Sequence, residues 1–295
     1  MTEAFDAVVT GGSGFLWRAC LGPALIAAGH RLLFLGRTDP RLPGASFRRW
    51  SPNDVNSDVS NDVVDDVTAP VFVHFASPIG AQVTDDNIQA LAVAAAAQAQ
   101  ACGARHVVHA SSGAVYGSGW SGSKGEDDDP SPTTPYGRGK LAAERALDAV
   151  VGAERTTHLR LFFPTPSIAA ARQAAAEGRA QLMLPRVLRD LAAGVDVVLH
   201  EERFLFNPCP GDVLVRVVDR CLRGAPLGVL NVAGALALSF EEFVLAAGAA
   251  AGLPVRFDRS KTGPARSMLA ATSRLATLVP GENDVRAFLA AGAAL

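Results

Sequence analysis

The sequence of 295 residues has no excess of charge of either sign and no long basic segment. Its 27 lysines and arginines stand against 29 aspartates and glutamates, which leaves a net charge of −2. Nucleic-acid binding rests largely on clustered basic side chains that neutralise phosphates in a salt-sensitive way. The charge pattern therefore argues against a nucleic-acid-binding protein.

Signals for secretion and for membrane insertion are missing as well. The N-terminus reads MTEAFDAVVTGG, whereas a signal peptide needs a basic start and an apolar stretch before a cleavage site. The apolar stretch 90–101 is short and is interrupted by Gln98 and Gln100, so it does not predict a membrane span. We expect a cytoplasmic protein without a membrane partner.

Cysteine is scarce, and the pattern typical of a structural metal site is absent. The four cysteines lie far apart, with no Cys-x-x-Cys pair, at positions Cys20, Cys102, Cys209 and Cys221. This argues against both a zinc site and a disulfide framework. The acidic run 126–129 indicates a solvated surface, because four consecutive side chains point apart rather than converge on a cation. We predict no metal site.

The sequence does contain a regular alternation of short apolar runs and helix-like stretches. The expected strands are 7–10, 31–35, 46–50, 71–75, 106–110 and 158–162, and the expected helices are 16–28, 87–101 and 135–151. Strands joined by crossover helices predict a parallel sheet covered on both faces. We therefore expect a doubly wound α/β fold of Rossmann type, which binds ligands beyond the carboxyl ends of its strands.

The alternation loosens after residue 163, which predicts a second and smaller part. We expect residues 1–163 to form a dinucleotide-binding domain and residues 164–295 to form mainly a substrate-binding lobe. Strand-like runs reappear within residues 195–235, so we expect some of that stretch to return to the sheet.

A glycine-rich turn, TGGSGFL, joins the first expected strand to the first helix. Glycines such as Gly11 and Gly14 allow a sharp turn and close approach to a pyrophosphate, which rests on free N–H groups at the helix N-terminus. Trp17 stands where the usual pattern has a third glycine that permits close packing of helix on strand. We expect the helix to be pushed outward or the indole to rotate away.

Arg37 follows the second expected strand, where NAD-selective sites usually carry an acidic residue for the ribose 2′-hydroxyl. An arginine nearby favours the 2′-phosphate of NADP instead. A solvated surface arginine is the alternative explanation. We expect NADP(H) rather than NAD(H).

Tyr136 and Lys140 lie four residues apart at the start of an expected helix and so share one face. A phenol with a pKa of about 10 is a poor base, but an ammonium one turn away favours the phenolate. Ser112 follows the strand 106–110 and can stabilise charge on a substrate oxygen during hydride transfer. Each signal alone is also explained by surface residues or by a serine that caps a strand. Together, behind a glycine-rich turn, they predict a catalytic set.

These segments resemble the extended short-chain dehydrogenase/reductases, the NAD-dependent epimerase/dehydratase family. The resemblance rests on TGGSGFL (10–16), VFVHFAS (71–77), Asn87 at a helix start, HASSGAVYG (109–117), YGRGK (136–140) and GVLNVAGALALSFEEF (228–243). It covers most of the chain, firmly to about residue 163 and loosely beyond.

The resemblance implies a bound nicotinamide dinucleotide and a C-terminal lobe that grips the substrate. It implies that Ser112, Tyr136 and Lys140 are catalytic, and that Tyr136 and Lys140 also bind the cofactor. The further cofactor-binding residues that it implies are Gly11, Gly14, Phe15, Leu16, Ala76 and Ser77. It also implies a homodimer formed through helices 87–101 and 136–151.

The family often carries an arginine, just before an aromatic strand, that holds the phosphate of a nucleotide sugar. Here the segment reads RFLFNPCPGD from residue 203 to 212, and its two prolines interrupt the strand. Arg203 is offset from the family position. Ser112 and Arg203 are our candidate substrate-binding residues.

We predict an NAD(P)-dependent oxidoreductase that moves a hydride to or from a carbonyl or carbinol carbon. The substrate oxygen would lie between Ser112 and Tyr136, and the cofactor supplies the difficult step. Net reduction is expected, because Arg37 suggests NADP(H). One alternative is a nucleotide-sugar epimerase or dehydratase with retained NAD. Another is a non-catalytic dinucleotide-sensing or scaffold protein on the same fold.

Overall fold

The computed structural model describes residues 2–52, 64–78, 83–120, 122–178, 182–260 and 263–292. By its internal contacts the chain divides into two units. Unit 1 comprises Met1–Gly117, Asp129–Arg160 and Val215–Leu230, and unit 2 comprises Ser118–Asp128, Leu161–Leu214 and Asn231–Leu295. The division predicted at residue 163 concerns binding roles and remains a prediction.

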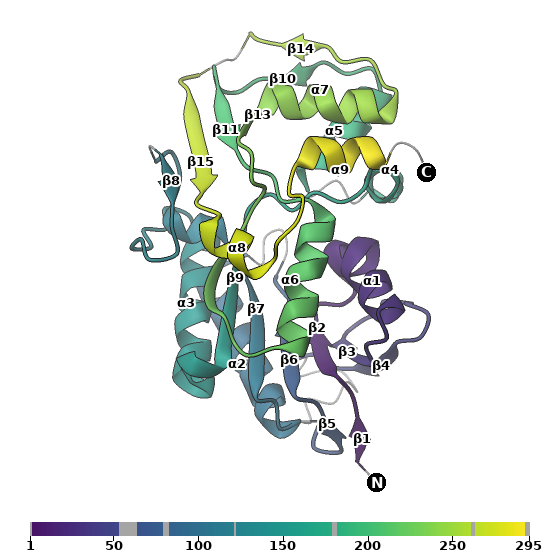
Figure 1. The fold of residues 1–295 in the computed structure, drawn as a ribbon, viewed down its shortest axis with the longest axis vertical. Coiled ribbons are helices and arrows are strands. Elements are labelled where there is room, and N and C mark those ends of the chain that lie inside the picture. The colour runs from purple at the N-terminus through teal and green to yellow at the C-terminus, as the bar shows by residue number, and fades with distance from the viewer. Residues whose placement is uncertain are drawn as a thin grey trace. The chain divides into compact units, whose positions relative to one another are not determined.

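Unit 1 is built around a seven-stranded sheet (Figure 1). The strands of this part of the chain are β1 (Glu3–Ala4), β2 (Ala7–Thr10), β3 (Leu32–Gly36), β4 (Ser46–Arg49), β5 (Val67–Thr68), β6 (Val71–His74), β7 (His106–Ser112), β9 (Thr156–Leu161) and β12 (Gly228–Val232). The helices are the π-helical turn η1 (Trp17–Leu21), α1 (Gly22–Ala27), α2 (Asp85–Ala101), the 3₁₀ turns η3 (Gly113–Tyr116) and η4 (Ala153–Arg155), α3 (Pro135–Val151) and α6 (Gly211–Arg223).

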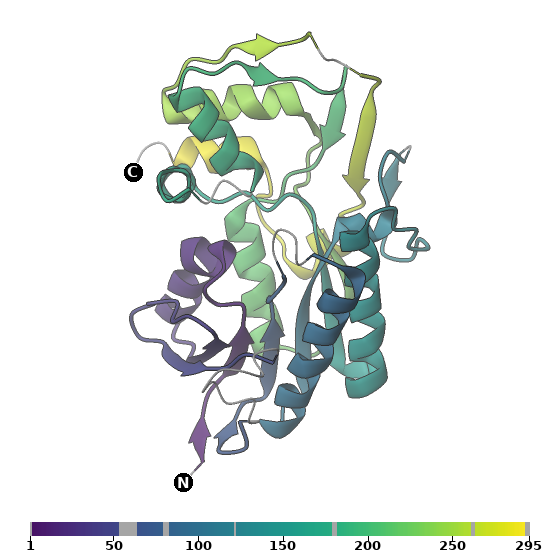
Figure 2. The same cartoon turned by 180° about the vertical axis from the view of Figure 1, so that it is seen from behind.

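The strand order, β12-β9-β7-β6-β2-β3-β4, is that of a doubly wound fold. The chain first builds outward from β2 to β3 and β4, and then returns to add β6, β7, β9 and β12 on the other side. The α2 and α3 helices cover one face of the sheet, and α1 and α6 cover the other (Figures 1 and 2). The expected parallel α/β fold is confirmed, and its switch point between β2 and β6 is where such folds bind ligands.

Local chemistry fixes where the two longest helices begin. The side chain of Thr84 accepts a hydrogen bond from the backbone N–H of Asn87 at 3.1 Å, which caps α2. Thr134 caps α3 in the same way through Gly137, with Pro135 at the first helical position. Both devices satisfy backbone N–H groups that a helix N-terminus leaves free. No helix among the described segments is long and apolar enough to cross a membrane.

Alanines dominate the inner side of α2 and allow close packing. One core cluster joins Phe72 and Val107 of the sheet to buried alanines of α2 and to Leu147 of α3. Small side chains there let α2 and α3 pack side by side over the sheet (Figure 2). The sheet face beneath these helices is thereby removed from water.

Unit 2 has its own sheets and core. Its strands are β8 (Ser123–Lys124), β10 (Val197–Val198), β11 (Phe204–Phe206), β13 (Leu238–Ser239), β14 (Phe257–Asp258) and β15 (Arg266–Ala270). Its helices, apart from the start of α6, are α4 (Ile168–Ala176), α5 (Met183–Ala192), α7 (Phe240–Ala251), α8 (Ser273–Leu278) and α9 (Val285–Ala291). Four strands pair in the order β13-β11-β15-β8, and β10 pairs with β14.

The structure adds detail to residues 195–235 and to the loop after residue 117. Of residues 195–235, only β12 joins the large sheet, because β10 pairs with β14 instead. Hydrogen bonds to other segments of unit 2 anchor the loop after residue 117. Its Trp120 indole donates to the carbonyl of Leu269 at 3.2 Å, and Asn231 donates to the carbonyl of Lys124 at 2.9 Å.

Three histidines lie buried on adjacent strands of the large sheet. His74 hydrogen-bonds the hydroxyl of Thr10 at 2.8 Å and stacks on His109, with ring centroids 5.6 Å apart. His106 hydrogen-bonds both Thr157 and the carbonyl of Cys221. Burial lowers the pKa of His74 to about 3 and that of His106 to about 4, and holds the pKa of His109 well below its usual value. The folded protein therefore keeps these imidazoles neutral.

We predict that acid weakens the fold before its carboxylates titrate. The unfolded chain binds protons at these histidines near pH 6.5, whereas the folded protein does not. Their contribution to the free energy of unfolding is therefore complete above pH 6.5 and is lost as the pH falls toward 4. Three such sites give a slope of about 4 kcal/mol per pH unit in the free energy of unfolding, measured by urea titration.

Replacing one member should reduce this slope. We expect His109→Leu to lower it by about one third, since each site contributes one proton. The matched variant His200→Leu, at an exposed position, should leave the slope unchanged. Equal slopes in all three proteins would contradict a histidine origin.

Candidate active site

The turn after β2 can be built only from glycine at its first position. Gly11 has a φ of +82°, and a Cβ atom there would lie 2.4 Å from the backbone nitrogen of Ala76. The N–H of Gly14 donates to the carbonyl of Gly11 at 2.9 Å and closes the turn. The loop is thereby pressed against the chain that leaves β6, where a dinucleotide pyrophosphate can approach the backbone closely.

Trp17 takes neither of the two positions expected from the sequence. Its indole is 1% exposed and packs edge-on against Phe34 and Phe75, with centroids 5.4 Å and 5.7 Å away. The helix widens into the π-turn η1, in which the N–H of Gly22 donates to the carbonyl of Trp17. A π-turn adds room within one helical turn. The chain thus accommodates a bulky residue at the place of the third glycine by packing it into the core.

The two glycines of the YGRGK segment bring the start of α3 close to its neighbours. A Cβ atom on Gly137 would lie 2.4 Å from the carbonyl oxygen of Ala114, and one on Gly139 would lie 2.8 Å from the Cδ1 atom of Ile88. The first turn of α3 is therefore in direct contact with η3 and α2, which no larger residue at these positions would allow.

Ser112, Tyr136 and Lys140 meet at the carboxyl end of β7. A hydrogen bond joins the side chains of Ser112 and Tyr136. Ser112 also accepts from the N–H of Ala114 at 3.2 Å, which fixes its hydroxyl. The Nζ atom of Lys140 donates to the carbonyl of Ala110 at 2.8 Å and lies 5.8 Å from the centroid of the Tyr136 ring. The structure brings together the three residues that the sequence singled out.

Burial changes the acidity of this set. It lowers the pKa of Lys140 to about 8, against the opposing influence of the Glu144 carboxylate. It also raises the pKa of the Tyr136 hydroxyl, while the hydrogen bond to Ser112 acts in the other direction. Tyr136 keeps 36% of its surface exposed, so water limits that rise. In the protein without a bound cofactor, the lysine proton is therefore the more weakly held of the two.

A second polar group beneath α3 escaped the sequence analysis. The carboxylate of Glu144 binds the guanidinium of Arg160 through Nε at 3.1 Å and Nη2 at 2.8 Å, and accepts from the hydroxyl of Ser111. Arg160 also donates to the hydroxyl of Tyr116 at 2.8 Å. The only signal in the sequence was the spacing of four residues between Lys140 and Glu144 on one helix.

The residues near β6 match the needs of a dinucleotide. The hydroxyl of Ser77 is buried and has no hydrogen-bond partner among the described residues, so it is available to a bound group. It follows Ala76, against which the glycine turn packs. Phe15 and Leu16 are half-buried at the start of the first helix. A cradle without Cβ atoms beside a buried, unused hydroxyl fits a dinucleotide.

Arg37 and Arg203 are both exposed. Arg37 lies in the bend directly after β3 in unit 1, and Arg203 directly precedes β11 in unit 2. Pro208 and Pro210 follow β11, which ends at Phe206 as the sequence suggests. Ser112, Tyr136, Lys140 and the glycine turn belong to unit 1, and Arg203 belongs to unit 2.

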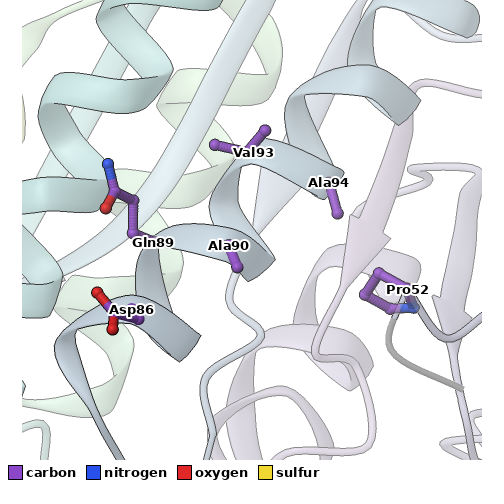
Figure 3. Close-up of a pocket in the computed structure, with 6 residues that line it drawn as sticks. All are labelled: Pro52, Asp86, Gln89, Ala90, Val93 and Ala94. Atoms are coloured by element: carbon purple, nitrogen blue, oxygen red, sulfur yellow. The ribbon is translucent and has the colours of Figure 1, made fainter.

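An open depression of about 420 Å³ lies on the outer side of α2 (Figure 3). Its lining residues are Pro52, Asp86, Gln89, Ala90, Val93 and Ala94. None of them belongs to the catalytic set. Among the residues that the structure describes, no group of three or more histidines, cysteines or acidic residues is placed to hold a metal ion.

A doubly wound sheet, a glycine cradle at its switch point and a convergent Ser-Tyr-Lys set define an enzyme of the short-chain dehydrogenase/reductase type. Comparison with protein families agrees, since the model of the NAD dependent epimerase/dehydratase family matches residues 7–203. The chain belongs to this family, as the resemblance indicated.

Solved structures with the same fold cover nearly the whole chain. MoeE5 in complex with UDP-glucose and NAD has a TM-score of 0.72 at 24% identity over 98% of this chain and 97% of that one. UDP-glucuronic acid 4-epimerase from Bacillus cereus, in complex with UDP-glucuronic acid and NAD, has a TM-score of 0.75 at 17% identity over 98% of both chains.

WbmG from Bordetella bronchiseptica, in complex with NAD and UDP, gives a TM-score of 0.75 at 20% identity over 96% of this chain and 90% of that one. At these identities the likeness establishes the fold. No curated protein sequence matches the chain.

The expectation of NADP(H) is wrong. The similar structures named above were solved with NAD, and none of them with NADP. The expectation rested on Arg37 alone, and that side chain is exposed in a bend. An exposed arginine needs no ligand to explain it, since its charge is satisfied by water.

We predict that the glycine turn tolerates no side chain at Gly11. Gly11→Ala and Gly29→Ala both place alanine at a positive φ, which costs about 1 kcal/mol. Only Gly11→Ala adds a clash with backbone atoms of Ala76, whereas Gly29 has open space around it. Urea unfolding should therefore show a clearly larger loss for Gly11→Ala. Equal losses would mean that the turn does not press on the chain after β6.

We also predict that Lys140, the candidate catalytic lysine, weakens the fold. Lowering the Lys140 pKa from 10.5 to about 8 means that its charge costs on the order of 3 kcal/mol below pH 8. Lys140→Met should stabilise the protein at pH 7 by about 2 kcal/mol, after the lost hydrogen bond is counted.

The direction of the pH dependence of stability follows from the difference in proton binding between the unfolded and the folded chain. Between pH 8 and 10.5 the unfolded chain binds the lysine proton and the folded protein does not, so the native protein gains stability as the pH rises through this window. The advantage of Lys140→Met should therefore disappear above pH 10.5. Lys124→Met serves as the control, and an equal pH-dependent gain there would contradict the prediction.

Proposed function

We propose that the chain is an epimerase or dehydratase of nucleotide sugars that keeps NAD bound through its catalytic cycle. The convergence of Ser112, Tyr136 and Lys140 at the end of β7 carries this proposal. Family membership supports an epimerase or dehydratase rather than a simple reductase. Relatives of the same fold were solved with UDP sugars and NAD, which supports this substrate class.

The three side chains divide the proton chemistry among them. Tyr136 takes the proton of a substrate hydroxyl as its phenolate and returns it later in the cycle. Lys140, protonated beside the ring, favours that phenolate. Ser112 holds the substrate oxygen by a hydrogen bond and stabilises the charge that develops on it. NAD, when bound, supplies the acceptor and donor of hydride at the adjoining carbon.

Unit 1 offers the residues that would hold the dinucleotide. Gly11, Gly14, Phe15 and Leu16 would lie along the pyrophosphate, with the free N–H groups of the turn as donors. Ala76 and Ser77 would flank the cofactor, and the buried hydroxyl of Ser77 would gain a partner. Lys140 and Tyr136 would stand at the nicotinamide ribose.

We assign substrate binding mainly to unit 2, which corresponds to the lobe expected after residue 163. Arg203 is its candidate for a phosphate contact, because it is exposed and precedes an aromatic strand. We further propose a homodimer formed through α2 and α3. Val93 and Val150 are 45% and 41% exposed on these two helices, which leaves apolar surface for a partner. The free thiols support a cytoplasmic location.

Two alternatives lose their main support. Net reduction rested on Arg37 and NADP(H), and the cofactor expectation is wrong. A non-catalytic scaffold would be favoured if Trp17, in place of the third glycine, obstructed the cofactor turn, but its indole is packed into the core beside Phe34 and Phe75.

We expect the purified protein to carry NAD and to interconvert UDP sugars without net change in the cofactor. The first substrates to test are UDP-glucuronic acid, UDP-glucose and UDP-N-acetylglucosamine, with products separated by chromatography. Tyr136→Phe should retain NAD and lose activity by about 10²-fold or more, because it removes the proton acceptor. Turnover at the unchanged rate would refute the role of Tyr136. Stoichiometric accumulation of NADH would instead identify a net oxidoreductase.

A further inference from the structure

We propose that Glu144 is a positioning residue of the catalytic set, whose fixed carboxylate keeps Lys140 in its protonated form beside Tyr136. The inference deepens the proposed function, on which its catalytic meaning rests. Its physical content concerns unit 1 alone and can be tested without a substrate.

Glu144 is held in place on both carboxylate oxygens. Arg160 donates to Oε1 from Nε and to Oε2 from Nη2, and Ser111 donates to Oε1. Glu144 and Arg160 each keep only 5% of their side-chain surface exposed. An ion pair with this little access to water is neither screened by salt nor free to rotate away. The carboxylate is a fixed negative charge within the protein.

Lys140 stands one helical turn from this charge and does not bind it directly. Its Nζ atom donates to the carbonyl of Ala110, and its side chain is 3% exposed. Burial alone favours the neutral amine, and the attraction of Glu144 works against that effect. The carboxylate therefore acts through space on the charge of the lysine while Arg160 and Ser111 keep it in position.

The other titratable groups packed near Lys140 supply no competing anion. His74 on β6 and His109 on β7 are buried and neutral, and the lysine charge further disfavours their protonation. Tyr136 on α3 is a phenol with a raised pKa. Tyr116 on η3 binds Arg160.

The charges of Lys140, Glu144 and Arg160 balance one another in a simple way. With Lys140 protonated, two cations share one carboxylate, and with Lys140 neutral the pair of Glu144 and Arg160 is self-compensated. Lys140 is the group whose pKa burial brings down to about 8. Removing Glu144 would leave the lysine beside the Arg160 cation alone, and a neutral amine would no longer favour the Tyr136 phenolate.

The charge of Lys140 can be followed directly by NMR. The chain has three lysines, Lys124, Lys140 and Lys261, so protein labelled with ¹³C at lysine Cε gives few signals, and Lys140→Met assigns the one of interest. We expect a titration midpoint of about 8 in the unmodified protein. In Glu144→Gln, which keeps the shape and removes the charge, the midpoint should fall by about one pH unit or more.

Asp148→Asn provides the matched control. Asp148 is a carboxylate one turn further along α3 and is hydrogen-bonded to His158 of β9 at 2.9 Å, much as Glu144 is bonded to Arg160 of β9. A general loosening of α3 would appear in both variants. We expect the Lys140 midpoint to stay in place in Asp148→Asn, and an equal displacement in both variants would overturn the proposal.

Glu144→Gln leaves Arg160 buried without its counter-ion, which can prevent folding. In that case the double variant Glu144→Gln/Arg160→Gln, which removes both charges, takes its place. Because Glu144 is the charge that raises the Lys140 pKa, the midpoint should fall in this variant too, by less than in Glu144→Gln. An unchanged midpoint in the folded variant would overturn the proposal. Because this titration needs no nucleotide sugar, a shifted midpoint in a protein without epimerase activity would refute the proposed function and leave the role of Glu144 intact.

Discussion

The candidate site depends on the close approach of α3 to the end of β7. Gly137 allows the helix to touch the backbone of η3 at a distance that a Cβ atom would prevent, and Gly139 allows a close contact with Ile88 of α2. That contact carries the buried side chain of Lys140 to the carbonyl of Ala110 and sets Tyr136 beside Ser112. Without it, the tyrosine and the lysine would share a helix face but would face no strand end.

Polar and ionisable side chains are buried where α3 packs on the sheet. The face of the sheet under α3 carries buried histidines, a serine and an arginine where a doubly wound fold usually places apolar side chains. Most of their polar atoms are matched by a partner on the helix or on a neighbouring strand, such as Glu144 for Arg160 and Asp148 for His158, whereas the Nε2 atom of His109 has none among the described residues. Such a layer is tolerable only when its hydrogen bonds are made, and it then fixes side chains more rigidly than apolar packing does.

Trp17 and Arg37 both depart from the usual dinucleotide-binding pattern, and they differ in their effect on the structure. Trp17 stands in place of the third glycine of the dinucleotide turn, yet a π-turn and two aromatic neighbours accommodate the indole in the core. Arg37 was the reason to expect NADP(H), yet the residue is exposed and, like any surface arginine, needs no ligand to explain it. The Trp17 side chain is large enough to reshape its helix. The Arg37 side chain is long and solvated, so its position needs no ligand.

Residue periodicity and local backbone demands were enough to predict the parallel α/β fold, the glycine turn and the spacing of Tyr136 and Lys140. That Glu144, Arg160 and the buried histidines belong to the same region follows from packing alone, since they come from segments far apart in the chain. Packing also pairs β10 with β14 rather than with the large sheet. These strands have two residues each and carry no distinctive pattern. Local rules specify elements, whereas the charge around a buried lysine is a property of what packs against it.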